Sequence, residues 1–183
     1  MPSIFFVCPD LNTPYGGVRV LYRCVDTLNA AGYAATIIHQ KAGFRCSWFE
    51  NSTQVTQARD VRFVTGDLLV LPEWYTDHIP FLAPGVPHLI FNQGPHLTFQ
   101  WSGLEKETWK PVVSADTIGI VTNSSYTFEY LNHCFPDIPV HQIRLGIDPF
   151  VFHPPEGEKL RQIAFMTRKR RPELIQLLRI MDL

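Results

Sequence analysis

The chain has 183 residues, of which 45% are hydrophobic and 18% are charged. This length suits one well-buried domain and part of a second, and the composition excludes wholesale disorder. The formal net charge of -1 gives no broad field that would attract nucleic acid, so an anionic ligand needs a local arrangement of donors.

The N-terminus predicts a cytoplasmic protein. The apolar residues 4–8 follow no basic segment and meet Asp10 at once, unlike a signal peptide. No apolar run approaches the roughly 18 residues that span a bilayer, which leaves peripheral association with a membrane as the remaining kind of membrane contact. The four cysteines form no C-x-x-C pair, and we expect reduced thiols.

The first 40 residues predict a strand, a glycine loop, a helix and a second strand. Residues 4–8 form a continuous apolar run, typical of a strand covered on both faces. From Val18 apolar side chains recur every three or four residues, and Gly32 stands where a helix ends. Residues 35–39 form the next strand. A strand, helix and strand in this order indicate a parallel sheet.

Further apolar runs continue the alternation of strands and helices. A helix is expected over residues 124–133, where residues 123–125 offer N-cap side chains, and a short helix after Glu73. Residues 98–111 have no clear period. The expected strands are residues 61–64, 68–71, 88–92, 117–122 and 140–145. Residues 1–152 are therefore predicted to form an α/β, doubly wound, mostly parallel sheet of the Rossmann-like kind.

The last 31 residues differ in character. Residues 153–158 are predicted to be a linker, residues 163–166 a strand, and Pro172 opens a helix. One strand and one helix cannot bury a core of their own. Residues 153–183 therefore predict a linker and the start of a truncated second domain.

The pair Gly16–Gly17 stands where the first helix begins. Two glycines at a helix N-terminus let amide groups approach a phosphate; a tight turn needed only for packing is the other open interpretation. A dinucleotide site would require G-x-G-x-x-G here and an acidic residue after the second strand. Because His39–Gln40 stands there instead, NAD binding is disfavoured.

Four segments of the chain resemble known family motifs. The glycine pair opens a helix that closes at residues 31–33, and residues 122–125 resemble a "T-x-S" segment. Residues 140–154 resemble the signature "V-x-V-I-P-N-G-V-D-x-x-x-F-x-P", and residues 162–171 resemble "G-R-x-x-x-x-K-G". In their order and spacing, which cover nearly the whole chain, the four segments resemble the retaining glycosyltransferases of the GT-B fold, of the family 4 type.

The chain departs from this family at three places. Arg144–Leu145 replaces Ile-Pro, and Met166–Thr167 replaces the glycine before arginine. The family holds the donor sugar with two glutamates eight positions apart in the second domain, and this chain has no such pair before Leu183. Donor recognition through those groups is impossible in this chain alone.

The resemblance implies transfer of a sugar from a nucleotide-sugar to a glycan or lipid-linked acceptor, with no metal or cofactor. The rule that ligands bind beyond the carboxyl ends of strands selects the residues for each role. Acceptor binding is assigned to Gln40, Gln93 and Asn123. Proton transfer or a hydroxyl contact is assigned to His96, for which a histidine in a Pro-rich turn is the alternative. Donor-phosphate binding is assigned to Gly16, Gly17, Arg168 and Lys169; a solvated basic turn is the alternative for Lys169.

Other functions are also compatible with the sequence. A non-catalytic binding or oligomerisation module would use the apolar face of the last helix, formed by Leu174, Leu177, Leu178 and Met181. A different α/β enzyme that shares only the sheet is the third reading. Trp48, Phe49 and Trp101 either stack on an acceptor or pack in the protein.

Overall fold

The computed structural model describes residues 2–78, 83–99, 112–155, 157–163 and 171–181. The chain divides into two compact units, residues 1–145 and 146–183. The division predicted from the sequence, after residue 152, lies seven residues later, in the segment between the last strand and the C-terminal helix.

The first unit is built on a parallel sheet of seven strands, in the order β3-β2-β1-β4-β5-β6-β7. Every neighbouring pair is parallel. The strands are β1 (Ser3–Val7), β2 (Ala34–His39), β3 (Val55–Gln57), β4 (Leu68–Pro72), β5 (His88–Asn92), β6 (Thr117–Thr122) and β7 (Val140–Gln142). The expected α/β fold of the Rossmann-like kind is confirmed.

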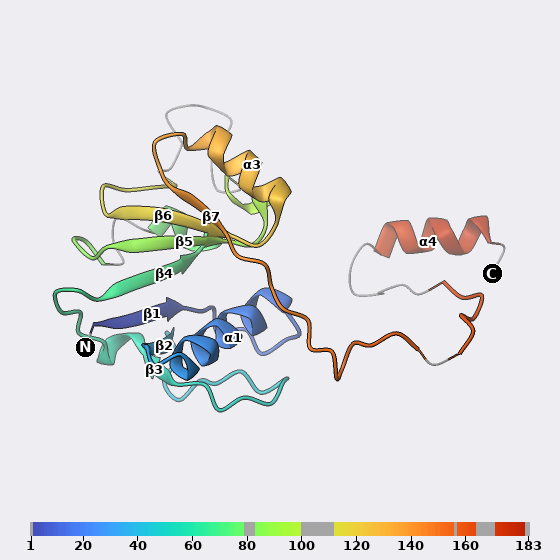
Figure 1. Cartoon of the computed structure of the whole chain (residues 1–183), viewed down its shortest axis with the longest axis horizontal. Helices are drawn as coiled ribbons and strands as arrows, with labels where there is room; N and C mark the ends of the chain where they lie inside the picture. The colour runs from blue at the N-terminus through green and yellow to red at the C-terminus, as the bar shows by residue number, and fades with distance from the viewer. Residues whose placement is uncertain (1, 79–82, 100–111, 156, 164–170, 182–183) are drawn as a thin grey trace. The chain divides into compact units, whose positions relative to one another are not determined.

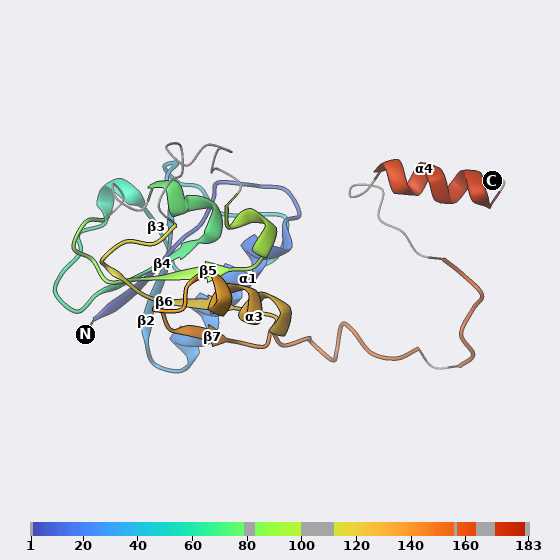
Figure 2. The same ribbon diagram turned by 90° about the horizontal axis from the view of Figure 1, so that it is seen from above.

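Helices cover both faces of the sheet. Helix α1 (Gly16–Ala30) packs on one face with Phe6, Ile37 and Val70, whereas α3 (Ser125–Cys134) places Leu131 on the other face. Side chains of a strand alternate between the faces, so each central strand contributes to two cores. Helix α3 lies beside β7 in both views (Figures 1 and 2). The described residues of this unit also include three short 3-10 segments: η1 (Ala58–Asp60), η2 (Glu73–His78) and η3 (Pro95–Leu97).

The ends of both long helices follow their sequences. Helix α1 ends before Gly32, whose φ of 87° is a left-handed conformation that favours glycine. Helix α3 begins after Ser124, whose hydroxyl accepts the amide of Thr127 at 3.2 Å. The two helix boundaries predicted from capping residues are confirmed.

The strand expected at residues 61–64 is wrong. These residues carry no strand, and the edge strand β3 lies earlier, at Val55–Gln57. Val61 and Phe63 pack against the core beneath the sheet, with the Phe63 and Phe5 rings 5.4 Å apart and perpendicular. Their alternation reflects cover of a sheet face rather than pairing with a strand.

The second unit, taken by itself, has one regular element among its described residues, helix α4 (Arg171–Ile180). Ile163 has no strand conformation, and residues 164–166 of the expected strand lie outside the described residues. In the part of the chain that the structure describes, no helix is long and apolar enough to traverse a bilayer.

Candidate functional site

The carboxyl ends of all seven strands lie at one edge of the sheet, because every pair is parallel. Strand β1 pairs with both β2 and β4, and the order of the strands reverses there. In doubly wound sheets ligands bind beyond the carboxyl ends at this reversal. The loops after β1, β2, β4, β5 and β6 therefore form the candidate site.

A buried hydrogen-bond network joins the loops after β1 and β2. The Tyr22 hydroxyl of α1 lies 2.7 Å from Nε2 of His39, and Nδ1 of His39 lies 2.9 Å from Oδ1 of Asp10. The Asp10 carboxylate also accepts the backbone amides of Gln40 and Lys41, at 3.2 and 2.8 Å. The start of the glycine loop is thus fixed to the end of β2.

This network is a structural anchor and not a catalytic relay. Tyr22 and His39 are 0% and 1% exposed, so neither can meet a substrate. Burial lowers the pKa of His39 despite the opposing effect of Asp10, and burial raises the pKa of Tyr22 to about 12. The amide of Cys46 donates to the Tyr22 oxygen, which directs the hydroxyl proton to Nε2. The pattern therefore assigns a neutral imidazole with its proton on Nδ1.

Two of the aromatic residues proposed as stacking groups belong to the packing around α1. The Phe49 ring lies 5.3 Å from that of Tyr22 and 4.6 Å from that of Trp48. The Arg19 guanidinium lies 5.8 Å from the centre of the Phe49 ring. These contacts favour a packing role for Trp48 and Phe49; Trp101 lies outside the described residues.

The two glycines at the start of α1 differ in their surroundings. A Cβ at Gly17 would meet the end of the Gln93 side chain at 3.3 Å, so this glycine lies in close contact with the segment after β5. Gly16 is exposed, lacks a positive φ and has no atom within 4 Å of an added Cβ. Neither packing nor backbone conformation therefore explains Gly16.

The N-terminus of α1 also keeps its donors available. Tyr15 provides no side-chain cap, and the first turn contains no acidic residue. Within the described residues, the amides of Gly16 and Gly17 donate to no backbone carbonyl; the first such bonds come from Val18 and Arg19. Free amides at a positive helix end suit an anion.

The segment after β5 brings two predicted residues to this edge. The amide of Gln93 donates from Nε2 to the carbonyl of Gly17 at 3.3 Å, which links β5 to the start of α1. His96 is exposed in η3, and its Cε1 lies 3.1 Å from the position of a Cβ on Gly94. Gln93, Gly17 and His96 thus share one region of the carboxyl edge.

Glu73 occupies the same region and was missed by the sequence analysis. Its carboxylate follows β4 directly, is 2% exposed, and lies 3.6 Å from the Cβ position of Gly94. Burial raises the pKa of Glu73 to about 7, although the backbone amides of Glu73, Gln93 and Gly94 oppose the shift by donating hydrogen bonds. A carboxyl group that titrates near neutral pH suits proton transfer or hydrogen bonding in either state.

Two further buried polar side chains continue this row across β5 and β6. Asn92 and Thr122 are register partners at the carboxyl ends of their strands, and they are 1% and 0% exposed. Pro72 and Phe91 are register partners on β4 and β5, so the next residues along each strand, Glu73 and Asn92, are neighbours as well. We call Glu73, Asn92 and Thr122 the polar row.

The polar row is incompletely hydrogen-bonded. Nδ2 of Asn92 donates to Oγ1 of Thr98 at 2.7 Å. Among the described residues, Oδ1 of Asn92 and Oγ1 of Thr122 have no hydrogen-bond partner. Leaving such an atom buried and unpaired costs about 1–3 kcal/mol. The indole N–H of Trp48, also without a full partner, faces the weakly accepting sulfur of Cys46.

The other predicted site residues are more scattered. Gln40 is exposed, and its carbonyl accepts Nε2 of Gln57 at 3.2 Å, on the β2 side of the sheet. Asn123 is half-buried between Thr122 and the N-cap of α3. The proposed phosphate-binding side chains of Arg168 and Lys169 lie outside the described residues.

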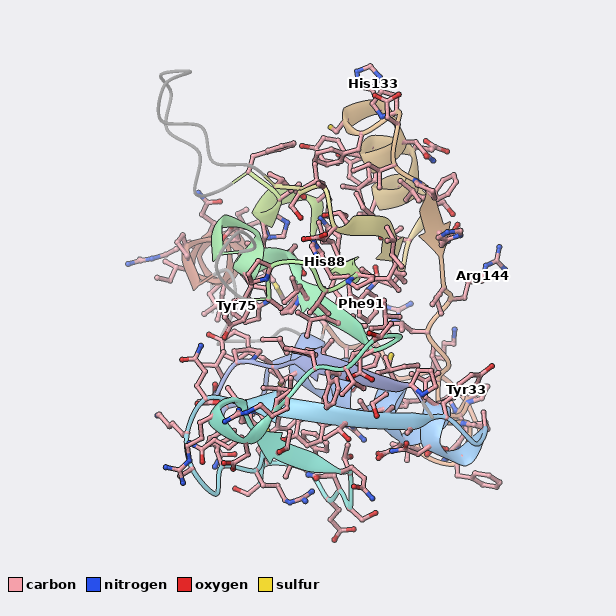
Figure 3. All side chains as sticks on the ribbon, turned by 90° about the vertical axis from the view of Figure 1, so that its left-hand side faces the viewer. Tyr33, Tyr75, His88, Phe91, His133 and Arg144 are labelled. Carbon is pink, nitrogen blue, oxygen red and sulfur yellow. The ribbon has the colours of Figure 1, made fainter. Side chains whose placement is uncertain are left out.

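No metal centre is evident in the described ranges, where no three His, Cys, Asp or Glu side chains gather to hold an ion. The labelled histidines illustrate their separation, since His88 lies within the sheet and His133 at the outer end of α3 (Figure 3). His88 is held by Thr117, whose Oγ1 lies 2.7 Å from its Nε2. Arg144, within the segment that resembles the family signature, is exposed and extends away from the sheet (Figure 3).

The polar row had a weak signal in the sequence. Asn92 and Thr122 are the polar last residues of two predicted strands, and Glu73 is the first acidic residue after another. Gln93 and Asn123, the residues predicted from the sequence, lie one position further along the chain. Only the register of neighbouring strands shows that the three side chains form one row.

Comparisons with known proteins add no relative. No protein-family model matches the sequence, and searches of curated proteins and of solved structures found no significant match.

Proposed function

We propose that this chain is the acceptor-side part of a glycosyltransferase that uses a nucleotide-sugar donor. The observation that carries the proposal is Gly16, which stands exposed at the N-terminus of α1 with open space beside it. The reversal of strand order beside it is where doubly wound sheets bind phosphate-containing ligands.

The surrounding groups support a division of roles. Amide donors at Gly16 and Gly17 suit the diphosphate of a donor, while Gln93 and Asn123 lie along the same edge for an acceptor. His96 is exposed beside Gly94, where it can contact a hydroxyl or transfer a proton. Arg168 and Lys169 remain proposed partners of the departing diphosphate. The donor carboxylates of the family are absent from this chain, so we expect it to bind a complete nucleotide-sugar hardly at all.

The test of the phosphate role is a titration of the ¹⁵N-labelled chain with inorganic pyrophosphate. The amide signals of Gly16 and Gly17 are expected to shift most. Gly16→Asp should abolish these shifts by repulsion, yet leave the fold intact, because an acidic residue at a helix N-terminus is stabilising by about 0.3–1 kcal/mol. Asp26→Asn, on the exposed surface of the same helix, serves as the control that leaves binding unchanged, because the amide oxygen can still accept the Thr53 hydroxyl that Asp26 binds at 2.9 Å.

Two results would contradict the proposal. The first is a pyrophosphate response that is the same in Gly16→Asp and in the unchanged chain. The second is micromolar affinity for UDP- or GDP-sugars in calorimetric titration, because such affinity contradicts the division of donor and acceptor roles.

A binding or oligomerisation module is the second candidate, favoured by the apolar side chains of the second unit. Leu174, Leu177 and Leu178 are half-buried and Met181 is 42% exposed. Sizing by light scattering separates the two candidates, since a stable dimer lost in Leu177→Ser favours this second one.

A further inference from the structure

We propose that protonation of Glu73 controls how firmly the loop of residues 93–97 (loop 93–97) is held against the start of α1. This loop follows β5, includes η3, and carries Gln93 and His96. The role needs no ligand at Glu73, which is 2% exposed. The contacts of Glu73 carry this inference independently of the proposed function, which adds only the consequence for a phosphate bound beside the loop.

Loop 93–97 is short and has fixed ends. The residues on either side of it, Asn92 and Thr98, are both buried, and Nδ2 of Asn92 donates to Oγ1 of Thr98 at 2.7 Å. Between them the amide of Leu97 donates to the carbonyl of Gly94 at 3.0 Å, which closes a compact turn. A loop whose ends are held together can open locally while the strand before it stays in the sheet.

Two contacts of Gln93 connect Glu73 to α1. The backbone amides of Gln93 and Gly94 donate to the carboxyl group of Glu73. The side chain of Gln93 donates through Nε2 to the carbonyl of Gly17 at 3.3 Å. Because Gln93 makes both contacts, a movement of the loop away from Glu73 also changes the contact with the start of α1.

Gly94 separates the carboxyl group of Glu73 from the surface. A Cβ at Gly94 would lie 3.6 Å from Oε1 of Glu73 and 3.1 Å from Cε1 of His96, which is exposed. The buried carboxyl group and an exposed ring therefore both lie close to one residue that has no side chain. Outward movement of loop 93–97 would bring water to the carboxyl group.

The sign of the effect follows from burial. Burial disfavours the ionised carboxyl group and raises the pKa of Glu73 to about 7, although the backbone amides oppose this shift. When the loop opens, water solvates the group and its pKa falls toward the ordinary value of 4.5. Because the closed loop binds the proton more tightly, protonation favours the closed loop and ionisation favours the open loop. The preference for the closed loop is therefore lost as the pH rises through 7.

Other titratable groups surround Glu73. On the described elements they are Tyr15 before α1, Asp10 after β1 and bound to His39, Tyr75 on η2, His88 at the amino end of β5 and His96 on η3. Burial raises the pKa of Tyr75, so this group stays neutral near pH 7. Arg19 of α1 lies against the ring of Phe49. Histidine ordinarily changes charge near neutral pH, so the test includes a variant without His96.

Amide hydrogen exchange of the ¹⁵N- and ¹³C-labelled full chain at pH 6 and pH 8 measures the opening of the loop. Protection factors correct for the intrinsic pH dependence of exchange, and they are compared for the amides of Gln93 and Gly94. The amide of Cys8, which donates to the carbonyl of Ile38 at 3.0 Å within the sheet, reports unfolding of the whole domain. The Cδ chemical shift of Glu73 follows its ionisation in the same samples.

In the unchanged chain we expect the protection factors of Gln93 and Gly94 to fall about tenfold from pH 6 to pH 8 and to lie below that of Cys8 at both values. Glu73→Gln keeps an oxygen that accepts the two amides but has no proton to lose, so its protection factors should be the same at both pH values. His96→Gln is the matched control and should keep the fall.

The inference is overturned if Gln93 and Gly94 are protected as strongly as Cys8, because the loop then opens only when the whole domain unfolds. It is also overturned if the fall with pH persists in Glu73→Gln or disappears in His96→Gln. Should Glu73→Gln not fold, the unchanged chain decides the matter, since the fall in protection and the Cδ shift of Glu73 must share one midpoint.

The exchange experiment uses no ligand, which separates this inference from the proposed function. If protection depends on pH as expected but pyrophosphate shifts no amide, the control by Glu73 stands and the phosphate role is rejected. If pyrophosphate shifts the amides of Gly16 and Gly17 but protection of the loop does not depend on pH, the phosphate role survives and the control by Glu73 is rejected.

Discussion

The two sides of the sheet reversal treat their buried polar groups differently. On the side of β1 and β2, Asp10, His39 and Tyr22 satisfy one another in a closed network. On the side of β4 to β6, Asn92 and Thr122 keep atoms without a partner among the described residues. Burial is nearly complete on both sides, so the two sides differ in hydrogen-bond satisfaction and not in burial. An unpaired buried atom lowers stability unless another polar group or a water completes its hydrogen bonding.

The largest effect that we predict is a change in the pH dependence of stability when Glu73, on the β4 side, is replaced by Gln. Burial raises the pKa of Glu73 to about 7 in the folded chain, from an ordinary value of 4.5. The folded state therefore holds a proton that the unfolded state releases between these pH values, and stability falls as pH rises through this window. Glu73→Gln removes this contribution, which is about 3 kcal/mol.

The measurement is the free energy of unfolding in urea at pH 4.5 and pH 8. From pH 4.5 to pH 8, the free energy of unfolding of Glu73→Gln should rise by about 3 kcal/mol relative to that of the unchanged chain. The lowered pKa of His39 acts in the opposite direction, but it is present in both proteins and cancels in the difference. Glu129→Gln, on the exposed surface of α3, should show no such growth. An equal pH dependence of stability for Glu73→Gln and the unchanged chain would contradict the raised pKa of the Glu73 carboxyl.

The second prediction tests the satisfied side. Tyr22→Phe leaves Nε2 of His39 and the amide of Cys46 without the hydroxyl that joins them. We expect a loss of about 2 kcal/mol in the free energy of unfolding. Tyr33→Phe is the control, since Tyr33 is 59% exposed and lies at the outer surface (Figure 3). A loss below about 0.5 kcal/mol for Tyr22→Phe, the range of surface substitutions, would show that the network anchors nothing.

The smallest predicted effects are the changes in stability when a glycine on each side of the sheet reversal, Gly94 and Gly16, is replaced by alanine. Gly94→Ala brings a Cβ to 3.1 Å from Cε1 of His96. Because the His96 side chain is exposed and can move, we expect a cost of only about 1 kcal/mol. Gly16→Ala enters open space at the start of α1 and should stabilise by about 0.5 kcal/mol. Thermal unfolding of both variants checks the prediction, and the reverse order of stabilities would contradict the described packing of the carboxyl edge.

The sequence supported the fold further than the site. Apolar runs located β1, β2, β4, β5 and β6, because strands buried on both faces leave a continuous signal. Strand β3 escaped because its three residues, Val55–Gln57, are half-buried at the sheet edge and include two polar side chains. Residues 61–64 were wrongly predicted as a strand because a segment that covers a sheet also alternates apolar and polar residues.

The candidate site was predictable only as a set of loops. Gly16, Gln93 and His96 were selected because each follows a strand or begins a helix, and the structure brings Gln93 against Gly17. The acceptor role of Gln40 and the role of Asn123 stay predictions, as do those of Arg168 and Lys169. Nothing local in the sequence distinguishes Asn92 from an ordinary strand end.

The amino-acid sequence by itself determined the parallel α/β class, the C-terminal end of α1, the N-terminal end of α3 and the position of the glycine pair, because periodicity and capping act over a few residues. Tertiary structure decided which polar groups are satisfied. Asp10 and His39 are hydrogen-bond partners although they lie 29 residues apart in the chain, and Asn92 and Thr122 become neighbours only through the register of β5 and β6. Hydrogen bonding between distant segments depends on the three-dimensional arrangement of the strands, and no local pattern encodes it.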